Sequence, residues 1–182
     1  MANFILKALA PILTGHLESI VWIRPEGRGT FLESPFIGNF VDAAFEAGHR
    51  DFVVDLEACS GMDSTFMGML AGLGISFRRK QAGQLTVVGT SDKTKASLVE
   101  LGLHHLSRIE PAKGAWIGRL EEFRSDLIPL TSEESGDKES YILKCHENLC
   151  EAEASNVDRF KTVLEMLGSK MVSPSDQDAA QS

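Results

Sequence analysis

Short runs of β-branched residues alternate with longer amphipathic stretches over much of the chain. Three such runs predict strands: Ser19–Arg24, Asp51–Glu57 and Gln84–Gly89. Stretches in which apolar residues recur with a helical period predict three helices, beginning near Ser34, Ser64 and Ser91. Ser107–Glu110 predicts a last short strand. Because helices alternate with the strands, the pattern predicts an α/β domain with largely parallel pairing.

Glycine, proline and small polar residues set the ends of the predicted helices. We expect Ser34 to cap the first helix with Pro35 in its first turn, and Gly48 to end it. Ser91 or the next residue caps the third helix, which Gly102 ends. These signals agree with the apolar period, so the predicted order of elements rests on two independent features.

The second helix, Ser64–Lys80, follows a loop at Ala58–Asp63 and contains several glycines. Glycine in a helix interior costs stability unless close packing offsets the loss. Gly68 and Gly72 are four residues apart and therefore share one face. We expect this face to approach the sheet closely.

Charge is distributed unevenly along the 182 residues, whose formal net charge is −8. Residues 1–124 hold 13 basic and 14 acidic residues, whereas residues 125–182 hold 5 and 12. This break predicts the following division: an N-terminal segment 1–16, a domain 17–124, a linker 125–139, a helical extension 140–172 and a disordered tail 173–182. The acidity argues against a protein that binds nucleic acid by neutralising phosphates.

The helical extension carries apolar stripes over Ser140–Leu167, with a hinge predicted near Ala154–Asn156. Apolar stripes of this kind are normally buried against another part of the protein or against a partner. Three outcomes are open: the extension packs on the domain, exchanges between the two chains of a homodimer, or offers a docking surface to another protein.

The remaining composition predicts a cytoplasmic protein without a cofactor. There are three cysteines, no run long enough for a membrane span and no signal-peptide pattern. Cys145 and Cys150 flank His146, but a zinc site needs more ligands at suitable spacing, so we expect no metal. No phosphate-binding glycine loop or nucleophile–base signature is present, so we do not expect an enzyme.

The segment Asp51–Gly74 carries the candidate chemistry. A strand ends in Asp55-Leu56, a loop follows, and the run from Asp63 to Gly68 (Asp-Ser-Thr-Phe-Met-Gly) begins a helix. Further on, a basic helix end is followed by a strand and by Leu98–Leu103 (Leu-Val-Glu-Leu-Gly-Leu). In this order the segments resemble the STAS domain, the fold of bacterial anti-sigma factor antagonists, over about residues 17–110. The usual Gly-x-Leu-Asp motif is replaced by Gly29-Thr30-Phe31.

The resemblance implies an α/β fold with a small, mostly parallel sheet and helices packed mainly on one face, plus the C-terminal helical extension. It also implies a phosphoswitch. The serine after the aspartate, here Ser64, is the acceptor, and Thr65 is the alternative. The implied partners are a serine kinase of the histidine-kinase-like ATPase type, which is also the anti-sigma factor, and a serine phosphatase. The implied partner-binding residues are Asp63, Ser64, Thr65, Phe66, Met67 and Gly68.

The same residues admit simpler interpretations. Asp63 and Ser64 are both good helix caps, and Phe66, Met67 and Met69 have the character of core residues. Since a helix N-terminus attracts anions, a ligand-sensing module that binds a nucleotide or another small molecule is the alternative function.

Overall fold

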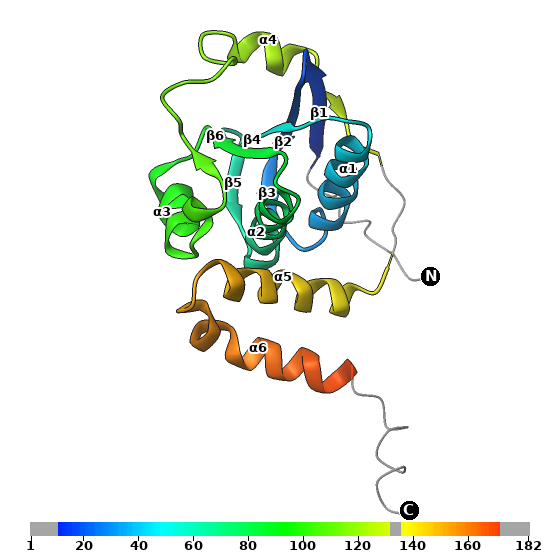
Figure 1. Cartoon of the computed structure of the whole chain (residues 1–182), viewed down its shortest axis with the longest axis vertical. Coiled ribbons are helices and arrows are strands. Elements are labelled where there is room, and N and C mark those ends of the chain that lie inside the picture. Colours follow the sequence, from blue (N-terminus) through cyan, green and yellow to red (C-terminus); the bar gives the residue numbers. More distant parts are fainter. Residues whose placement is uncertain (1–10, 132–135, 172–182) are drawn as a thin grey trace, which may run out of the picture.

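The computed structural model describes residues 11–131 and 136–171. Its main sheet has six strands in the order β7-β6-β4-β2-β1-β8 (Figure 1). The strands are β1 (Ile12–Leu17), β2 (Ile20–Pro25), β4 (Asp51–Asp55), β6 (Gln84–Val88), β7 (Arg108–Ile109) and β8 (Ile128–Pro129). The pairs β2–β4, β4–β6 and β6–β7 are parallel, and β1 pairs antiparallel with both of its neighbours. The mostly parallel α/β sheet is therefore confirmed.

Helices cover mainly one face of this sheet, as the resemblance implied. They are α1 (Ser34–Glu46), α2 (Ser64–Arg79) and α3 (Asp92–Glu100), which is followed by the short 3-10 helix η1 (Leu103–His105). Their buried residues join those of the strands in one core, in which Ile37, Phe52 and Leu70 are fully enclosed. The opposite face carries a smaller cluster, in which Phe123 of α4 (Leu120–Ser125) packs against Trp22.

Several short elements were not expected from the pattern. The predicted boundary between residues 16 and 17 falls within β1, and the predicted linker contains β8, which pairs with β1. The predicted loop Ala58–Asp63 contains β5 (Cys59–Met62), which pairs parallel with β3 (Gly27–Gly29) in a separate two-stranded sheet. β3, β5 and β8 are short and are held by long-range pairing, so their local sequence signal is weak. The division into domain, linker and extension remains our proposal, and the predicted tail lies outside the described residues.

The expected helix ends need one correction. Glu33, not Ser34, is the N-cap of α1, and its side chain makes no capping hydrogen bond. Ser34 instead donates from its hydroxyl to the carbonyl oxygen of Thr30. Ser91 caps α3 as expected by accepting from the amide of Thr94. Gly102 follows α3 with φ of +84°, a left-handed conformation that favours glycine.

The helical extension forms α5 (Lys138–Ala152) and α6 (Asn156–Met171), which we call the C-terminal arm. The break between the helices lies where the hinge was expected. In Figure 1, α5 lies between the α/β domain and α6. Buried Cys145, Leu149 and Phe160 belong to the main core, so the arm packs on its own domain.

The glycine face of α2 packs against α5, not against the sheet. A Cβ atom on Gly68 would lie 2.3 Å from the carbonyl oxygen of Cys145, and one on Gly72 would lie 2.4 Å from Nδ2 of Asn148. The expectation of a close approach was right, but the expected neighbour was wrong. The pattern indicated a close contact without indicating which element makes it.

Asp55, at the end of β4, joins the sheet to α4. Its carboxylate is fully buried and accepts hydrogen bonds from Arg24 at 2.7 Å, Arg124 at 2.8 Å and the Trp22 indole at 3.3 Å. Burial by itself would raise the pKa of Asp55, but hydrogen bonds from Arg124, the Glu57 amide and Arg24 outweigh it and hold that pKa below its ordinary value. This cluster fixes the strand end from which the chain turns toward α2.

Candidate functional site

Asp63 organises the start of α2. One carboxylate oxygen accepts from the amide of Phe66 at 2.8 Å, which is the capping bond expected of this residue. The other accepts from the amide of Phe31 at 2.8 Å. The backbone N–H of Asp63 also donates to the carbonyl oxygen of Gly29. Asp63 therefore ties the loop after β3 to the helix and holds the next residue in place.

The close fit between β3 and α2 requires a glycine at position 29. A Cβ atom there would lie 2.8 Å from the ring of Phe66, which is fully buried beneath the strand. Phe31, two residues later, is one of the few large apolar side chains that are exposed. The Gly29-Thr30-Phe31 segment that replaces the usual motif thus presents an aromatic side chain next to Asp63.

Ser64 is the first residue of α2 and is only partly exposed. Its hydroxyl oxygen lies 3.0 Å from Nε2 of His146 on α5. The other ring nitrogen, Nδ1, lies 2.8 Å from the carbonyl oxygen of Ile142. A carbonyl oxygen only accepts, so Nδ1 carries a proton. When this is the only proton on the ring, Nε2 accepts the hydrogen bond from Ser64.

His146 is itself enclosed, with 3% of its surface exposed. Its ring meets the edge of Phe160 of α6 at 5.0 Å between centroids. The arm therefore contacts Ser64 through a side chain that both arm helices hold in place.

The implied site residues fall into two groups, one partly exposed and one buried. Asp63 and Ser64 are partly exposed, whereas the next four residues are covered: Thr65, Phe66, Met67 and Gly68. Phe66 and Met67 belong to the core, as the simpler interpretation of their sequence predicted. Of the implied residues, Asp63 and Ser64 offer surface to another molecule while the arm is docked, and neighbouring Phe31 is exposed beside them.

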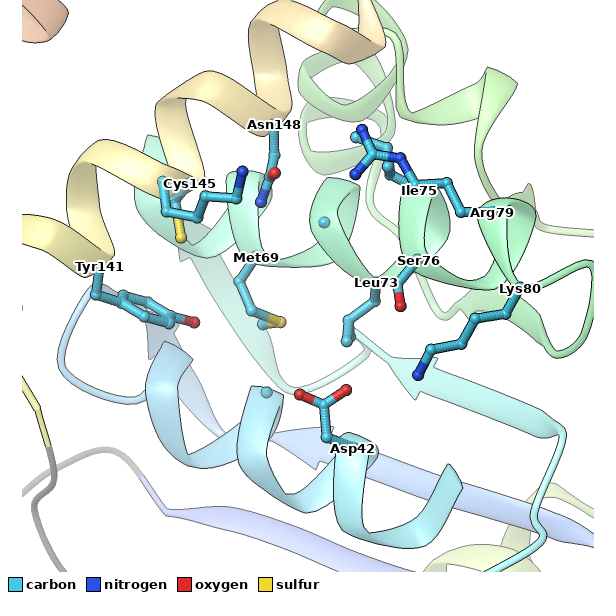
Figure 2. A pocket seen from close by; sticks show the side chains of 13 residues that line it. Asp42, Met69, Leu73, Ile75, Ser76, Arg79, Lys80, Tyr141, Cys145 and Asn148 are labelled. Atoms are coloured by element: carbon cyan, nitrogen blue, oxygen red, sulfur yellow. The ribbon is translucent and has the colours of Figure 1, made fainter. Parts of the chain in front are cut away.

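A cavity of about 380 Å³ lies beside the arm, between α1, α2 and α5 (Figure 2). In Figure 2, Asp42 points into it from α1, and Cys145 and Asn148 approach from α5. Lys80 and Lys144 also line it. Burial raises the pKa of the Cys145 thiol to about 12, so this thiol is neutral and unreactive at ordinary pH.

Within the described residues, no group of three or more His, Cys, Asp or Glu side chains is arranged so that it could bind a metal ion. None of the described helices is long and apolar enough to span a membrane.

A family model supplies the decisive comparison. The STAS domain model matches residues 12–115, from the first residue of β1 to the segment before α4. The chain belongs to the STAS domain family. A search of curated proteins finds no significant match. The C-terminal arm lies outside the matched residues.

Solved structures agree with the STAS fold. TM1081 from Thermotoga maritima, described as an anti-sigma factor antagonist, has a TM-score of 0.50 at 16% identity, over 61% of this chain and 92% of its own. An NMR structure of TM1081 also has a TM-score of 0.50, at 17% identity, over 61% and 86%. Unphosphorylated SpoIIAA, an anti-sigma factor antagonist, is similar at 18% identity over 63% of this chain and 98% of its own, with a TM-score of 0.48.

One residue beside Ser64 was missed from the sequence. His146 lies 82 positions after Ser64 and was considered only as a metal ligand between two cysteines. The apolar stripe of α5 predicted that the helix buries one side. Nothing in the local pattern indicated that the buried side meets the start of α2.

Proposed function

We propose that the protein is a non-catalytic regulator in a partner-switching pathway, similar to an anti-sigma factor antagonist. In its unmodified form it binds a serine kinase that is also the anti-sigma factor, and phosphorylation of Ser64 releases that partner. A serine phosphatase restores the hydroxyl. The observation that carries the proposal is the partly exposed Ser64 hydroxyl at the first position of α2, beside an aspartate fixed by two hydrogen bonds.

The chemistry of the proposed step suits this position. The bond from Ser64 Oγ to the terminal phosphorus of ATP forms as the bond to the leaving ADP breaks, and the hydroxyl proton is lost. The product adds about −1.5 to −2 charges at pH 7 beside the Asp63 carboxylate. A partner surface that fits a neutral hydroxyl then meets repulsion, so affinity falls without refolding of the domain.

Ser64 is a better acceptor than Thr65. The Thr65 side chain is buried, and a kinase would have to unpack the start of α2 to reach it. We therefore expect the partner to contact Asp63, Ser64 and Phe31 first. Thr65, Phe66, Met67 and Gly68 support this surface from beneath while the arm is docked.

The proposal is tested by mapping the phosphopeptides of the full chain, isolated from the cells that naturally produce it. We expect phosphate on Ser64 and none after Ser64→Ala substitution, with Thr65→Val as the matched control that leaves Ser64 modified. In a binding assay with the cognate kinase, Ser64→Asp should lose affinity at least about tenfold, which corresponds to about 1.4 kcal/mol. Equal binding by Ser64→Asp, Ser64→Ala and the unmodified chain would contradict the switch.

The cavity in Figure 2 supports the alternative, a STAS module that binds a nucleotide or another small molecule. Its size falls within the range of about 300–1,000 Å³ common to ligand sites, and Lys80 and Lys144 bring positive charge. Calorimetry with ATP and GTP tests this function. Heat of binding that disappears in Lys80→Ala would favour it over the partner switch, and no heat with either nucleotide would reject these two ligands.

A further inference from the structure

The docked arm uses the Ser64 hydroxyl as a hydrogen-bond donor. Nε2 of His146 lies 3.0 Å from this hydroxyl, and in the tautomer whose only proton is on Nδ1, donated to Ile142, the Nε2 lone pair accepts the bond from Ser64. A phosphorylated serine has no hydroxyl proton to donate. Its ester and phosphoryl oxygens would face the Nε2 lone pair of this buried tautomer.

A small shift of the arm would not make room for a phosphate on Ser64. The backbone of α5 lies against Gly68, where the space for even a methyl group is taken by the Cys145 carbonyl. His146 is held from behind by Phe160. The contact nearest to Ser64 therefore has little room for three additional oxygens and their hydration.

Charge acts in the same direction. The Asp63 carboxylate lies beside Ser64 and close enough to Cys145 to raise the pKa of its thiol, after the larger effect of burial. A phosphate would place a second anion between this carboxylate and the arm. Two anions at one partly buried helix end repel each other more strongly than they would in water.

We propose that phosphorylation of Ser64 and docking of the C-terminal arm exclude each other, so that the arm is an intramolecular clamp over the switch serine. The inference rests on the proposed function in taking Ser64 as the acceptor. By linkage, docking of the arm disfavours the phosphorylated form of Ser64 at equilibrium by the same free energy by which the phosphate loosens the arm. The released arm and the uncovered face of α2 both present apolar surface that is buried in the docked form.

Native cysteines report on the state of the arm. Cys145 lies in the α2–α5 contact with 2% of its surface exposed, so a thiol reagent reaches it only when the arm opens. Cys59 is buried in the domain on β5 and is reached only by wider unfolding. The ratio of their labelling rates separates release of the arm from loss of the whole fold.

The experiment compares full-length chains that differ at one serine. One carries phosphoserine built in at position 64 during translation, and the matched control carries it at position 91, the exposed N-cap of α3. The third is Ser64→Ala, which removes the hydrogen bond and adds no group. Labelling of each cysteine by a thiol reagent is followed by mass spectrometry.

We expect phosphoserine at position 64 to speed labelling of Cys145 by about tenfold or more, the effect of leaving one buried polar group unpaired. Cys59 should not change, phosphoserine at position 91 should have no effect, and Ser64→Ala should give a smaller rise. Unchanged labelling of Cys145 would overturn the proposal. Slower labelling, the result if a protonated His146 binds the phosphate, would overturn it as well. An equal rise in the labelling rates of Cys59 and Cys145 would also overturn the proposal.

Failure of this inference is distinct from failure of the proposed function. The phosphate is built into the chain, so the result does not depend on whether a kinase modifies Ser64. Absence of phosphate on Ser64 in host cells would reject the proposed function and leave the labelling result standing.

Discussion

Single residues decide how the site is built, and two of them do so through charge. Asp63 positions the start of α2, and Asp55 fixes the strand end on the other side of the connecting segment. The sequence placed both carboxylates at element ends. It predicted the capping role of Asp63 but gave no sign that Asp55 has two arginine partners, because Arg24 and Arg124 lie 31 and 69 residues away.

Replacing Asp55 with asparagine should destabilise the protein strongly at neutral pH. Arg24 and Arg124 would lose the buried carboxylate and keep only exposed ones such as that of Glu57, and breaking a buried pair typically costs about 3–5 kcal/mol. Chemical denaturation at pH 7 measures the loss. Thr90→Ala, at a site where the hydroxyl makes only an exposed contact with Glu110, is a control that should change stability little.

The Asp55 carboxylate should also make the free energy of unfolding depend on pH in the acidic range. The folded pKa of Asp55 lies below its unfolded value of about 3.9, so its contribution is complete above that value and is lost as the pH falls through the lower folded pKa. Denaturation curves at pH 7, 4 and 3 should therefore show a steeper loss for the natural chain than for Asp55→Asn. Parallel losses would contradict this account.

Gly29 should tolerate no side chain, whereas Gly61 on the paired strand β5 should tolerate one. Gly29→Ala would press a methyl group into the Phe66 ring, and overpacking of this kind costs about 1–3 kcal/mol. Gly61→Ala on β5 meets open space and serves as the matched control. Thermal unfolding of the two variants compares them directly. Equal melting temperatures would show that Phe66 can move aside.

Elements meet through contacts that the hydrophobic period does not specify. The period and end signals predicted α1, α2, α3 and both arm helices, because these depend on local propensity and on an amphipathic face. The same signals missed β1, β3, β5, β8 and α4. β3, β5 and β8 are stabilised by pairing with strands that are distant in the sequence, and α4 is too short to show a clear period. β1 pairs with the adjacent strand β2 and was missed all the same.

The contact between α2 and α5 gives a prediction at this scale. Gly68→Ala should force α5 away from α2, because the new methyl group would meet the backbone of α5 and not a flexible side chain. We expect a loss of about 1–3 kcal/mol and faster amide hydrogen exchange in α5. Gly38→Ala on α1, where the new atom has only an ordinary contact with Tyr141, should leave exchange in α5 unchanged.

The whole molecule joins a nearly neutral domain to a C-terminal arm whose charge is also nearly balanced, with 5 basic and 6 acidic residues over 138–171. Ion pairs cross this boundary: Arg79 with Glu151 and Arg159 with Glu100. All four side chains are exposed, and apolar residues of the arm are part of the main core. Burial of apolar surface therefore stabilises the docked arm more than charge does.

A double-mutant cycle on Arg79→Ala and Glu151→Ala tests this ranking. The coupling energy should be no more than about 1 kcal/mol and should shrink in high salt, as for other exposed pairs. Leu149→Ala, which empties a fully buried position in the same contact, should cost about 2–5 kcal/mol. A coupling energy larger than the cost of Leu149→Ala would reverse the ranking.

The sequence by itself determined the α/β class, the helices, the capping Asp63 and the candidate acceptor Ser64. Each of these depends on residues within a few turns of one another or on a run of adjacent segments. Only the tertiary structure decided that the arm returns to its own domain, that Gly68 and Gly72 face α5, and that Ser64 forms a hydrogen bond with His146. Those contacts join residues far apart in the chain, and many alternative pairings satisfy the same local pattern.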